Sequence, residues 1–156
     1  HRWIGPSERV MADAETYVGR RFDPQRGDEV AVDIPDSLGV LARMTGGARA
    51  SYRLSTVVGA APAAANGISI YGSAGTLHWT MDDSMTFAPA GDEPQPLAPD
   101  PGAAHDWRVE RDFIDSIREG APVTLTSFED GVLYMQFVEA VWRSWSEGRP
   151  VALASI

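Results

Sequence analysis

The residues able to perform acid–base or metal chemistry are few in this 156-residue sequence, and they are scattered. The histidines are His1, His78 and His105, and none stands four residues from another, which is the spacing of a metal-binding pair on a helix. The acid pairs Asp82-Asp83 and Glu129-Asp130 fall at an expected turn and an expected helix start, where carboxylates are favoured for local reasons. We therefore predict no metal site and assign no catalytic residue. A hydrolase that uses His78 or His105 with a nearby aspartate is an alternative.

Two residue types are absent, and each absence excludes a kind of chemistry. Without cysteine the chain can hold no disulfide, thiolate nucleophile or Cys-based zinc site. All 13 basic residues are arginine, so the chain supplies neither a Schiff-base lysine nor the lysine of a P-loop. The GxSxG motif of a serine nucleophile elbow does not occur either.

The segment SIYGSAGTLHW, residues 69–79, contains two glycines that could belong to a phosphate-binding loop. Such a loop needs a strand before it and a helix after it, because the helix N-terminus supplies amide donors and a favourable dipole. Here Gly75 is followed by Thr-Leu-His-Trp-Thr-Met, which alternates like a strand. We therefore interpret Gly72–Gly75 as the tight turn of a hairpin, where glycine tolerates a positive φ.

Three residues are candidate substrate contacts: Arg53, His105 and Trp107. Arg53 follows Arg49 by four residues on one face of an expected strand, so the two guanidinium groups could hold an anionic substrate or pair with acids on a neighbouring strand. His105 and Trp107 flank Asp106 at an expected helix start beside a proline-rich loop, which is a reasonable edge for a pocket. The structural alternative is that Asp106 caps the helix and Trp107 anchors it.

Alternation of apolar and polar residues predicts the strands that would position these side chains. The expected strands cover residues 9–18, 37–44, 48–58, 68–71, 76–81 and 85–88, with a short last strand at 151–153. Gly46-Gly47 predicts a hairpin between the second and third of them. The polar segment FDPQRGDE, 22–29, is expected to be a break, and the proline-rich residues 89–104 are expected to form no regular structure.

Helical spacing of apolar residues follows the proline-rich segment. The first helix is expected from about Val109 to Gly120, and the second opens with a capping box at Ser127 and ends at Gly148. Apolar residues surround a narrow polar stripe on the second helix, so we expect it to be largely buried. Strands followed by helices predict an α+β fold: an open-faced, mostly antiparallel mixed sheet with helices packed on one face.

The sheet face away from the helices is expected to be open. Its expected occupants are Asp13, Glu15, Tyr17, Arg49, Arg53, Tyr71 and His78. This mixture of charged and aromatic residues is unlike a core, and an open sheet face of this size most simply meets a second copy of itself. We therefore expect a homo-oligomer.

Length and composition limit the class of protein. The length suggests one domain, residues 1–156, and no apolar run approaches the length needed to span a bilayer. The net charge of −9 opposes a nucleic-acid partner or an anionic membrane surface, because both attract clustered positive charge. The first residues, HRWIGPSERV, do not resemble a signal peptide, so a cytoplasmic location is expected. A start without methionine suggests a fragment of a longer protein.

Several short motifs follow one another with a consistent order and spacing. They are the turn Gly72–Gly75 with Thr76-Leu77, the helix end Phe113–Gly120, the helix opening Ser127–Gly131, Glu139-Ala140 with Ser144, and the closing Gly148–Val151. The arrangement extends over about residues 8–153 and resembles the C-terminal domain of the Gfo/Idh/MocA family, which includes glucose–fructose oxidoreductase and inositol dehydrogenase.

The resemblance implies one half of a two-domain, NAD(P)-dependent oxidoreductase that acts on a sugar, polyol or related alcohol. In that family an N-terminal Rossmann domain binds NAD or NADP and carries a catalytic lysine in a Glu-Lys-Pro motif. The C-terminal domain, of the dihydrodipicolinate-reductase-like type, contacts substrate and forms the oligomer interface through its open sheet.

This chain departs from the whole-enzyme pattern in ways that limit its own chemistry. It contains neither GxGxxG nor lysine, so we expect it to bind no cofactor by itself and to be inactive alone. His1 abuts Arg2-Trp3, too close to match the spacing of the family's catalytic histidine, and that role is not transferred to it. The alternative function is a non-enzymatic binding or protein-interaction module with the same sheet architecture.

Overall fold

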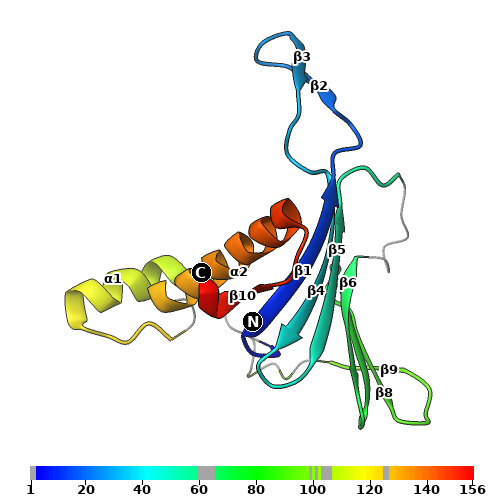
Figure 1. The fold of residues 1–156 in the computed structure, drawn as a ribbon. Coiled ribbons are helices and arrows are strands. Elements are labelled where there is room, and N and C mark those ends of the chain that lie inside the picture. The colour runs from blue at the N-terminus through cyan, green and yellow to red at the C-terminus, as the bar shows by residue number, and fades with distance from the viewer. Residues whose placement is uncertain (1–2, 60–65, 99, 101, 103–106, 125–126) are drawn as a thin grey trace. The chain divides into compact units, whose positions relative to one another are not determined.

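Figure 1 shows the computed structural model of the chain, which describes residues 3–59, 66–98, 100, 102, 107–124 and 127–156. The chain folds as two compact units, one formed by residues 1–57 with 109–156 and the other by residues 58–108. Every strand pairing among the described residues is antiparallel. Together with two helices these sheets confirm the predicted α+β class.

The first unit contains one four-stranded sheet, one two-stranded ribbon and both helices. Its elements are β1 (Ser7–Glu15), β2 (Arg20–Asp23), β3 (Asp28–Ala31), β4 (Ser37–Met44), β5 (Arg49–Ser55), α1 (Val109–Glu119), α2 (Phe128–Glu147), β10 (Val151–Ala152) and a last 3-10 turn (Leu153–Ser155). The four-stranded sheet has the order β10-β1-β4-β5. The predicted Gly46-Gly47 hairpin joins β4 to β5, with Gly47 at φ 87°.

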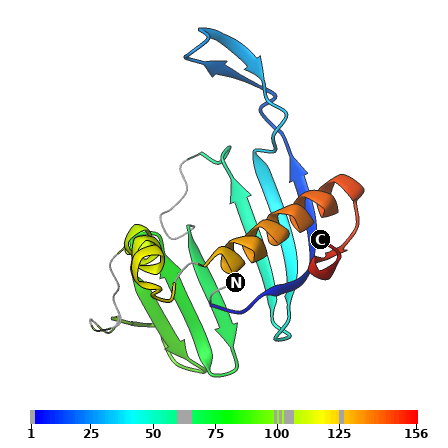
Figure 2. The same cartoon turned by 90° about the vertical axis from the view of Figure 1, so that its left-hand side faces the viewer.

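One face of this sheet is covered by α2, which lies across it in Figure 2. The alternating residues of β1 and β4 that face the helix are buried, as the sequence predicts. The core consists of Val10, Ala12, Val40, Ala42, Met44, Ala140, Val151 and Leu153. Beside it the ring of Tyr52 packs on that of Phe137 with centroids 5.5 Å apart, and burial raises the pKa of the Tyr52 phenol.

The ends of α2 follow from local chemistry. Its capping box is present: the Asp130 N–H donates to the Ser127 Oγ over 3.1 Å, and the Ser127 N–H donates to the Asp130 carboxylate over 3.1 Å. Gly148 ends the helix in the left-handed region, with φ 63°. The predicted helix boundaries are therefore confirmed.

The prediction that α2 is largely buried is wrong for the described part of the chain. Only Ala140 and Ser144 are buried on this helix. Its outer side exposes large apolar side chains, among them Val132, Met135 and Trp142. The sheet covers only one stripe of the α2 surface. Apolar residues around the whole helix therefore do not mean that every side of it is buried.

The other helix, α1, ends as predicted at Gly120, which has φ 68°. None of its residues is buried. The ring of Phe113 lies edge-on to that of Phe128, with centroids 6.3 Å apart. The expectation of helices packed on one sheet face therefore holds for α2, while α1 buries no side chain against the described residues.

The polar segment FDPQRGDE, predicted as a break, belongs to a two-stranded ribbon formed by β2 and β3. Its centre is a turn in which the Gly27 N–H donates to the Asp23 carbonyl over 2.8 Å, with Gly27 at φ 69°. The turn residues dominate the local sequence and hide the short strands on either side, which is why periodicity did not reveal them.

The second unit is a four-stranded sheet in the order β6-β7-β8-β9. Its strands are β6 (Gly67–Gly72), β7 (Gly75–Thr80), β8 (Met85–Pro89) and β9 (Gln95–Pro96). The predicted hairpin is confirmed, because Gly72 pairs with Gly75 across the two-residue turn Ser73-Ala74. A Cβ on Gly75 would lie 2.2 Å from the carbonyl oxygen of Ala88, so only glycine fits at that close approach.

The prediction that residues 89–104 form no regular structure needs one correction. Gln95 and Pro96 form the short strand β9, which pairs with β8. Strand β9 lies at the edge of its sheet, where the missing N–H of a proline costs no ladder hydrogen bond. Within the described residues, neither helix is long and apolar enough to cross a bilayer.

Candidate functional site

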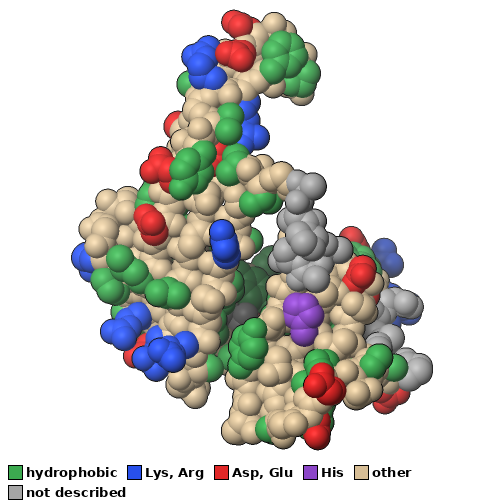
Figure 3. Space-filling view, turned by 90° about the vertical axis from the view of Figure 1, so that its right-hand side faces the viewer, with side chains coloured by type: hydrophobic (Ala, Val, Ile, Leu, Met, Phe, Trp, Pro, Cys, Tyr) green, Lys and Arg blue, Asp and Glu red, His purple; other side chains and the backbone are tan. Residues whose placement is uncertain are grey.

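The open face of the first sheet, opposite α2, carries four of the charged side chains that the sequence suggested as functional. Strand alternation places Asp13 and Glu15 of β1, and Arg49 and Arg53 of β5, on this face, as predicted. Figure 3 looks onto it, and basic side chains gather toward the lower edge of this sheet beside apolar ones, with acidic side chains above them. Tyr17 lies beyond the end of β1, whereas Tyr71 and His78 belong to the second unit.

Strand register arranges the open face into cross-strand rows. In the first row, Arg43 is the partner of Arg9 on β1 and of Arg49 on β5. The next row joins Met11, Leu41 and Ser51. Sequence reasoning found Arg49 and missed Arg9 and Arg43, because their neighbourhood depends on which strands pair and in what register. The predicted Gly46-Gly47 hairpin is the one local signal that could have indicated that Arg43 pairs with Arg49 across the turn.

Arg53 lies on β5 two cross-strand rows beyond the row of Arg49. Gly39 is its partner on β4, and Gly39 is also the partner of Asp13 on β1, so all three belong to one row. Gly39, the middle residue of this row, has no side chain, so space is left on this face between Asp13 and Arg53. Arg53 makes no ion pair with a described residue, so its guanidinium can bind a polar or anionic group.

Asp36 fixes the segment that joins the β2–β3 ribbon to this sheet. Its buried carboxylate accepts hydrogen bonds from the Tyr17 N–H and the Val18 N–H, each over 2.9 Å, and Arg21 lies 3.5 Å away. These backbone hydrogen bonds, the one from Tyr17 first, and the Arg21 charge hold the pKa of Asp36 below its usual value, although burial opposes them. Asp36 therefore serves as a structural anion at the base of the ribbon.

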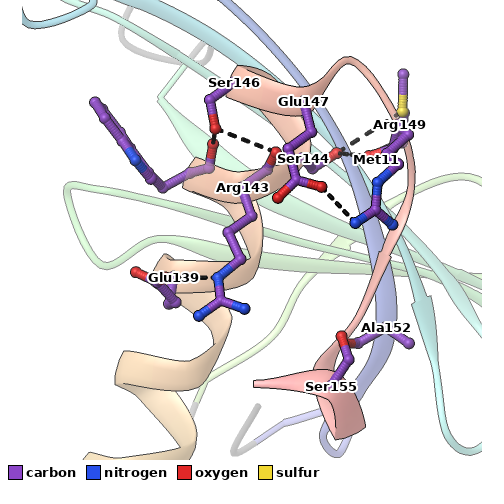
Figure 4. Close-up of polar contacts among 10 residues, drawn as sticks. Met11, Glu139, Arg143, Ser144, Ser146, Glu147, Arg149, Ala152 and Ser155 are labelled. Carbon is purple, nitrogen blue, oxygen red and sulfur yellow. Dashed lines mark hydrogen bonds and ion pairs between the residues drawn. The ribbon is translucent and has the colours of Figure 1, made fainter.

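Ser144 connects α2 to β1, and Figure 4 shows its hydroxyl beside Met11 of β1 and Arg149. Its Oγ accepts the Ala12 N–H over 2.9 Å and donates to the Arg149 carbonyl over 2.7 Å. Strand β10 pairs with β1 only as far as Val10. The next N–H of β1 that points toward the β10 edge is that of Ala12, and no residue of β10 accepts its hydrogen bond. The serine hydroxyl takes the place of a third residue of β10.

The second unit presents a polar face of its own. In one cross-strand row, His78 is the partner of Ser69 and of Thr86. The Ser69 Oγ lies 2.8 Å from the His78 Nδ1. A serine nucleophile would need the second ring nitrogen of its histidine oriented by an acid, and no acid is hydrogen-bonded to His78 in the described part of this unit. Among the described residues the pair therefore lacks the third member that nucleophilic catalysis by serine requires.

At the far end of that sheet, a network of hydroxyl groups orders the β7–β8 turn. Thr80 Oγ1 donates to the Asp82 carboxylate and lies 2.5 Å from the Ser84 Oγ. The hydrogen bond from Thr80, together with those from Ser84, lowers the pKa of Asp82. Asp83 adopts a positive φ of 62° in the same turn. The acid pair Asp82-Asp83 therefore has the local turn role that the sequence indicated.

The three predicted substrate contacts fall in different parts of the chain. Arg53 belongs to the first unit, and Trp107, which is 79% exposed, belongs to the second. His105 lies outside the described residues. Among the described side chains, no group of three or more His, Cys, Asp or Glu residues could hold a metal ion.

The Gly72–Gly75 turn lacks the geometry of a phosphate-binding glycine loop. The Gly72–Gly75 turn leads from one strand into another, so no helix N-terminus follows it. The space beside Gly75 is taken up by the backbone of Ala88. The turn therefore has a structural role, as the sequence analysis expected.

Comparison with solved structures shows that parts of several oxidoreductases have a similar fold. Levoglucosan dehydrogenase, in complex with NADH and L-sorbose, superposes with a TM-score of 0.72 and 21% identity over 95% of this chain. An NAD-binding oxidoreductase from Klebsiella pneumoniae gives a TM-score of 0.74 and 17% identity over 95%. An aldose-aldose oxidoreductase from Caulobacter crescentus, complexed with glycerol, gives 0.68 and 18% over 95%.

These neighbours are oxidoreductases of the Gfo/Idh/MocA type, so the predicted resemblance is confirmed at the level of fold. The chain spans under half the length of each, 46% of levoglucosan dehydrogenase, 46% of the Klebsiella pneumoniae protein and 42% of the Caulobacter crescentus protein. No protein-family model matches the chain, and no curated protein matches it in sequence. At these identities the likeness concerns the fold.

Proposed function

We propose that this chain is the substrate-binding and self-association half of an NAD(P)-dependent oxidoreductase that acts on a sugar, polyol or related alcohol. The observation that carries the proposal is the fold. Almost the whole chain superposes on less than half the length of oxidoreductases whose names mention NAD, a sugar or glycerol. A Rossmann domain outside residues 1–156 would bind the nicotinamide cofactor, which supplies hydride transfer. The proposal includes a cytoplasmic location.

The chain's own contribution to such a reaction is to bind and orient the substrate. Arg53 can donate up to five hydrogen bonds from a rigid fork and is exposed on an open strand face. Trp107 offers an exposed ring on which the apolar face of a sugar can stack, and we assign His105 to the same task. None of the three is proposed to transfer a proton or hydride.

A dehydrogenase assay of the full-length protein tests this function. We expect reduction of NAD or NADP with at least one sugar or polyol from a broad panel. Arg53→Gln should raise KM for that substrate while the protein stays folded, and Arg26→Gln, an exposed arginine paired with Asp23 in the ribbon, should leave KM unchanged. If the full-length protein reduces neither cofactor and binds sugars without turnover, the non-enzymatic binding module becomes the better description.

Self-association through the open face of the first sheet is the second part of the proposal. The face is a regular antiparallel surface with exposed Leu41 near its centre, and such surfaces commonly pair with their own copies. Leu41→Arg should shift the protein toward the monomer in analytical ultracentrifugation. Leu54→Arg is the matched control, because Leu54 is similarly exposed, at 59% against 65%, but points to the opposite face of the sheet.

A further inference from the structure

The only asparagine in the sequence, Asn66, stands immediately before a glycine. An asparagine followed by glycine can lose its side-chain amide without an enzyme, because the backbone nitrogen of the next residue can attack the side-chain carbonyl carbon. The reaction needs an accessible asparagine, a small following residue and a backbone N–H that is not already hydrogen-bonded.

The N–H of Gly67 points to the open edge of its sheet. Gly67 begins β6, which is the outermost strand in the order β6-β7-β8-β9. The Met81 N–H donates to the Asn66 carbonyl over 3.1 Å, so the hydrogen-bonding groups of Asn66 point toward β7. These directions alternate along an antiparallel strand, so the Gly67 N–H points away from β7. No described residue accepts a hydrogen bond from it, and Asn66 and Gly67 are both exposed.

The close approach of the two strands requires a glycine at position 67. A Cβ on Gly67 would lie 2.3 Å from the carbonyl oxygen of Trp79. A larger residue would shield Asn66 from attack, but it would also have to push β6 away from β7. The packing of this hairpin therefore keeps the reactive pair in place.

The Asp130-Gly131 pair provides a contrast within the same chain, since an aspartate before a glycine can form the same cyclic imide. Here the Gly131 N–H donates to the Ser127 carbonyl over 3.1 Å, and the Asp130 carboxylate accepts the Ser127 N–H over 3.1 Å. Both reacting groups are thus engaged, and ring closure would require the first turn of α2 to open.

We propose that Asn66 is a site of spontaneous modification, at which the exposed amide is converted to isoaspartate and aspartate. The Gly67 nitrogen forms a bond to the Asn66 Cγ, and ammonia leaves with the proton of that nitrogen, which gives a cyclic imide. Water opens the ring at the α-carbonyl to give isoaspartate, or at Cγ to give aspartate. This site is independent of the proposed function, since it needs neither a nicotinamide nor a sugar.

Isoaspartate changes the start of β6. The backbone then runs through the side-chain carbons of residue 66, and the carbonyl that accepts the Met81 N–H becomes a free carboxylate. The new negative charge lies close to the Asp82-Asp83 turn, in a chain whose net charge is already −9. The modification therefore loosens the β6–β7 pairing at this end.

Incubation of the full-length protein in mildly alkaline buffer, folded and in urea, followed by peptide mass spectrometry, tests the site. Trypsin releases residue 66 in the peptide 54–108 and residue 130 in the peptide 119–143. The matched variant Asp130→Asn places a second asparagine–glycine pair in α2, so both pairs are compared in one molecule. Methylation by an isoaspartate-specific carboxyl methyltransferase distinguishes isoaspartate from aspartate, and circular dichroism verifies that the variant folds.

We expect Asn66 to react in the folded protein about as fast as in urea. The asparagine introduced at position 130 should react at least about tenfold more slowly in the folded protein than Asn66, and at a comparable rate in urea. The proposal is overturned if folding slows the reaction of Asn66 tenfold or more in the wild-type protein, or if both asparagines are equally protected.

Hydrogen exchange measures the consequence at β6. The Met81 amide should exchange faster in the isoaspartate form than in the unmodified protein. Asn66→Asp is the matched control, because it adds the same charge without lengthening the backbone, and it should keep the slower exchange. Equal exchange in the isoaspartate form and the unmodified protein would contradict the loosening of β6.

Discussion

Replacing Ser144 with alanine removes the hydroxyl group that connects α2 to β1. In the wild-type protein this hydroxyl is fully buried, accepts the Ala12 N–H over 2.9 Å and donates to the Arg149 carbonyl over 2.7 Å. Alanine leaves both groups without this partner. The Ala12 amide is enclosed between the sheet and the helix, so water cannot replace the lost acceptor at no cost.

The expected loss follows from the burial of the two orphaned groups. A buried N–H without a partner costs about 1–3 kcal/mol, and the Arg149 carbonyl, at an exposed residue, adds about 0.5–1.5 kcal/mol. Ser144→Ala should therefore lower the free energy of unfolding by roughly 2–4 kcal/mol. That is a large share of the total stability of a domain, which is about 5–15 kcal/mol.

Urea denaturation followed by tryptophan fluorescence measures this loss, since Trp142 and Trp145 lie on α2 with ring centroids 5.0 Å apart. The matched control is Ser146→Ala on the same helix. Its exposed hydroxyl donates to carbonyls of its own helix, that of Trp142 over 2.8 Å and that of Arg143 over 3.3 Å. The stability of the Ser146→Ala protein should therefore change by no more than about 0.5 kcal/mol. Equal stabilities of the two variants would refute the assignment of Ser144 as the connection between helix and sheet.

Two further variants test the anchor of the ribbon and the turn of the second unit. Because the folded-state pKa of Asp36 is lowered from 3.8, its carboxylate stabilises the protein above pH 3.8 and this contribution is lost as the pH falls through the folded-state pKa. The stability difference between wild type and Asp36→Asn should therefore shrink on acidification in urea titrations. A difference that does not change with pH would contradict this assignment of Asp36. Gly75→Ala should destabilise the second unit by more than about 2 kcal/mol, because its Cβ would meet the Ala88 oxygen at 2.2 Å and its φ is 150°. Gly72→Ala has only an ordinary 3.7 Å contact and should cost less than about 1 kcal/mol, so comparable melting temperatures would exclude this steric account.

The parts of the fold that the sequence predicted are those with a local signal. Alternation gave the faces of β1 and β5, and turn chemistry gave the hairpins at Gly46-Gly47 and Gly72–Gly75. The capping box at Ser127 set the start of α2. Each of these depends on residues close together in the chain, which is why one sequence suffices to find them.

The parts that the sequence did not predict depend on distant residues. The arginine row requires the register of β1 on β4, and the role of Ser144 requires that β10 end opposite Val10. Asp36 stands outside any motif, and its hydrogen bonds to Tyr17 and Val18 depend on how the ribbon leaves the sheet. Long-range pairing of this kind leaves no periodic trace in the sequence.

Burial of α2 was mispredicted for a related reason. An apolar pattern all round a helix indicates that it needs covering, but it does not say what covers each side. In the described residues the sheet covers one stripe, while Val132, Met135 and Trp142 stay exposed. Under the proposed function these side chains are candidates for contact with the remainder of the enzyme.

The central claim is that residues 1–156 bind substrate and self-associate while the nicotinamide cofactor is bound elsewhere in the protein. The most direct test is the titration of this 156-residue chain with NADH and NADPH, followed by the fluorescence of the reduced nicotinamide. The account predicts no saturable binding of either cofactor and no dehydrogenase activity of the chain alone. Tight, saturable binding, or turnover of a nicotinamide cofactor by this chain, would contradict it.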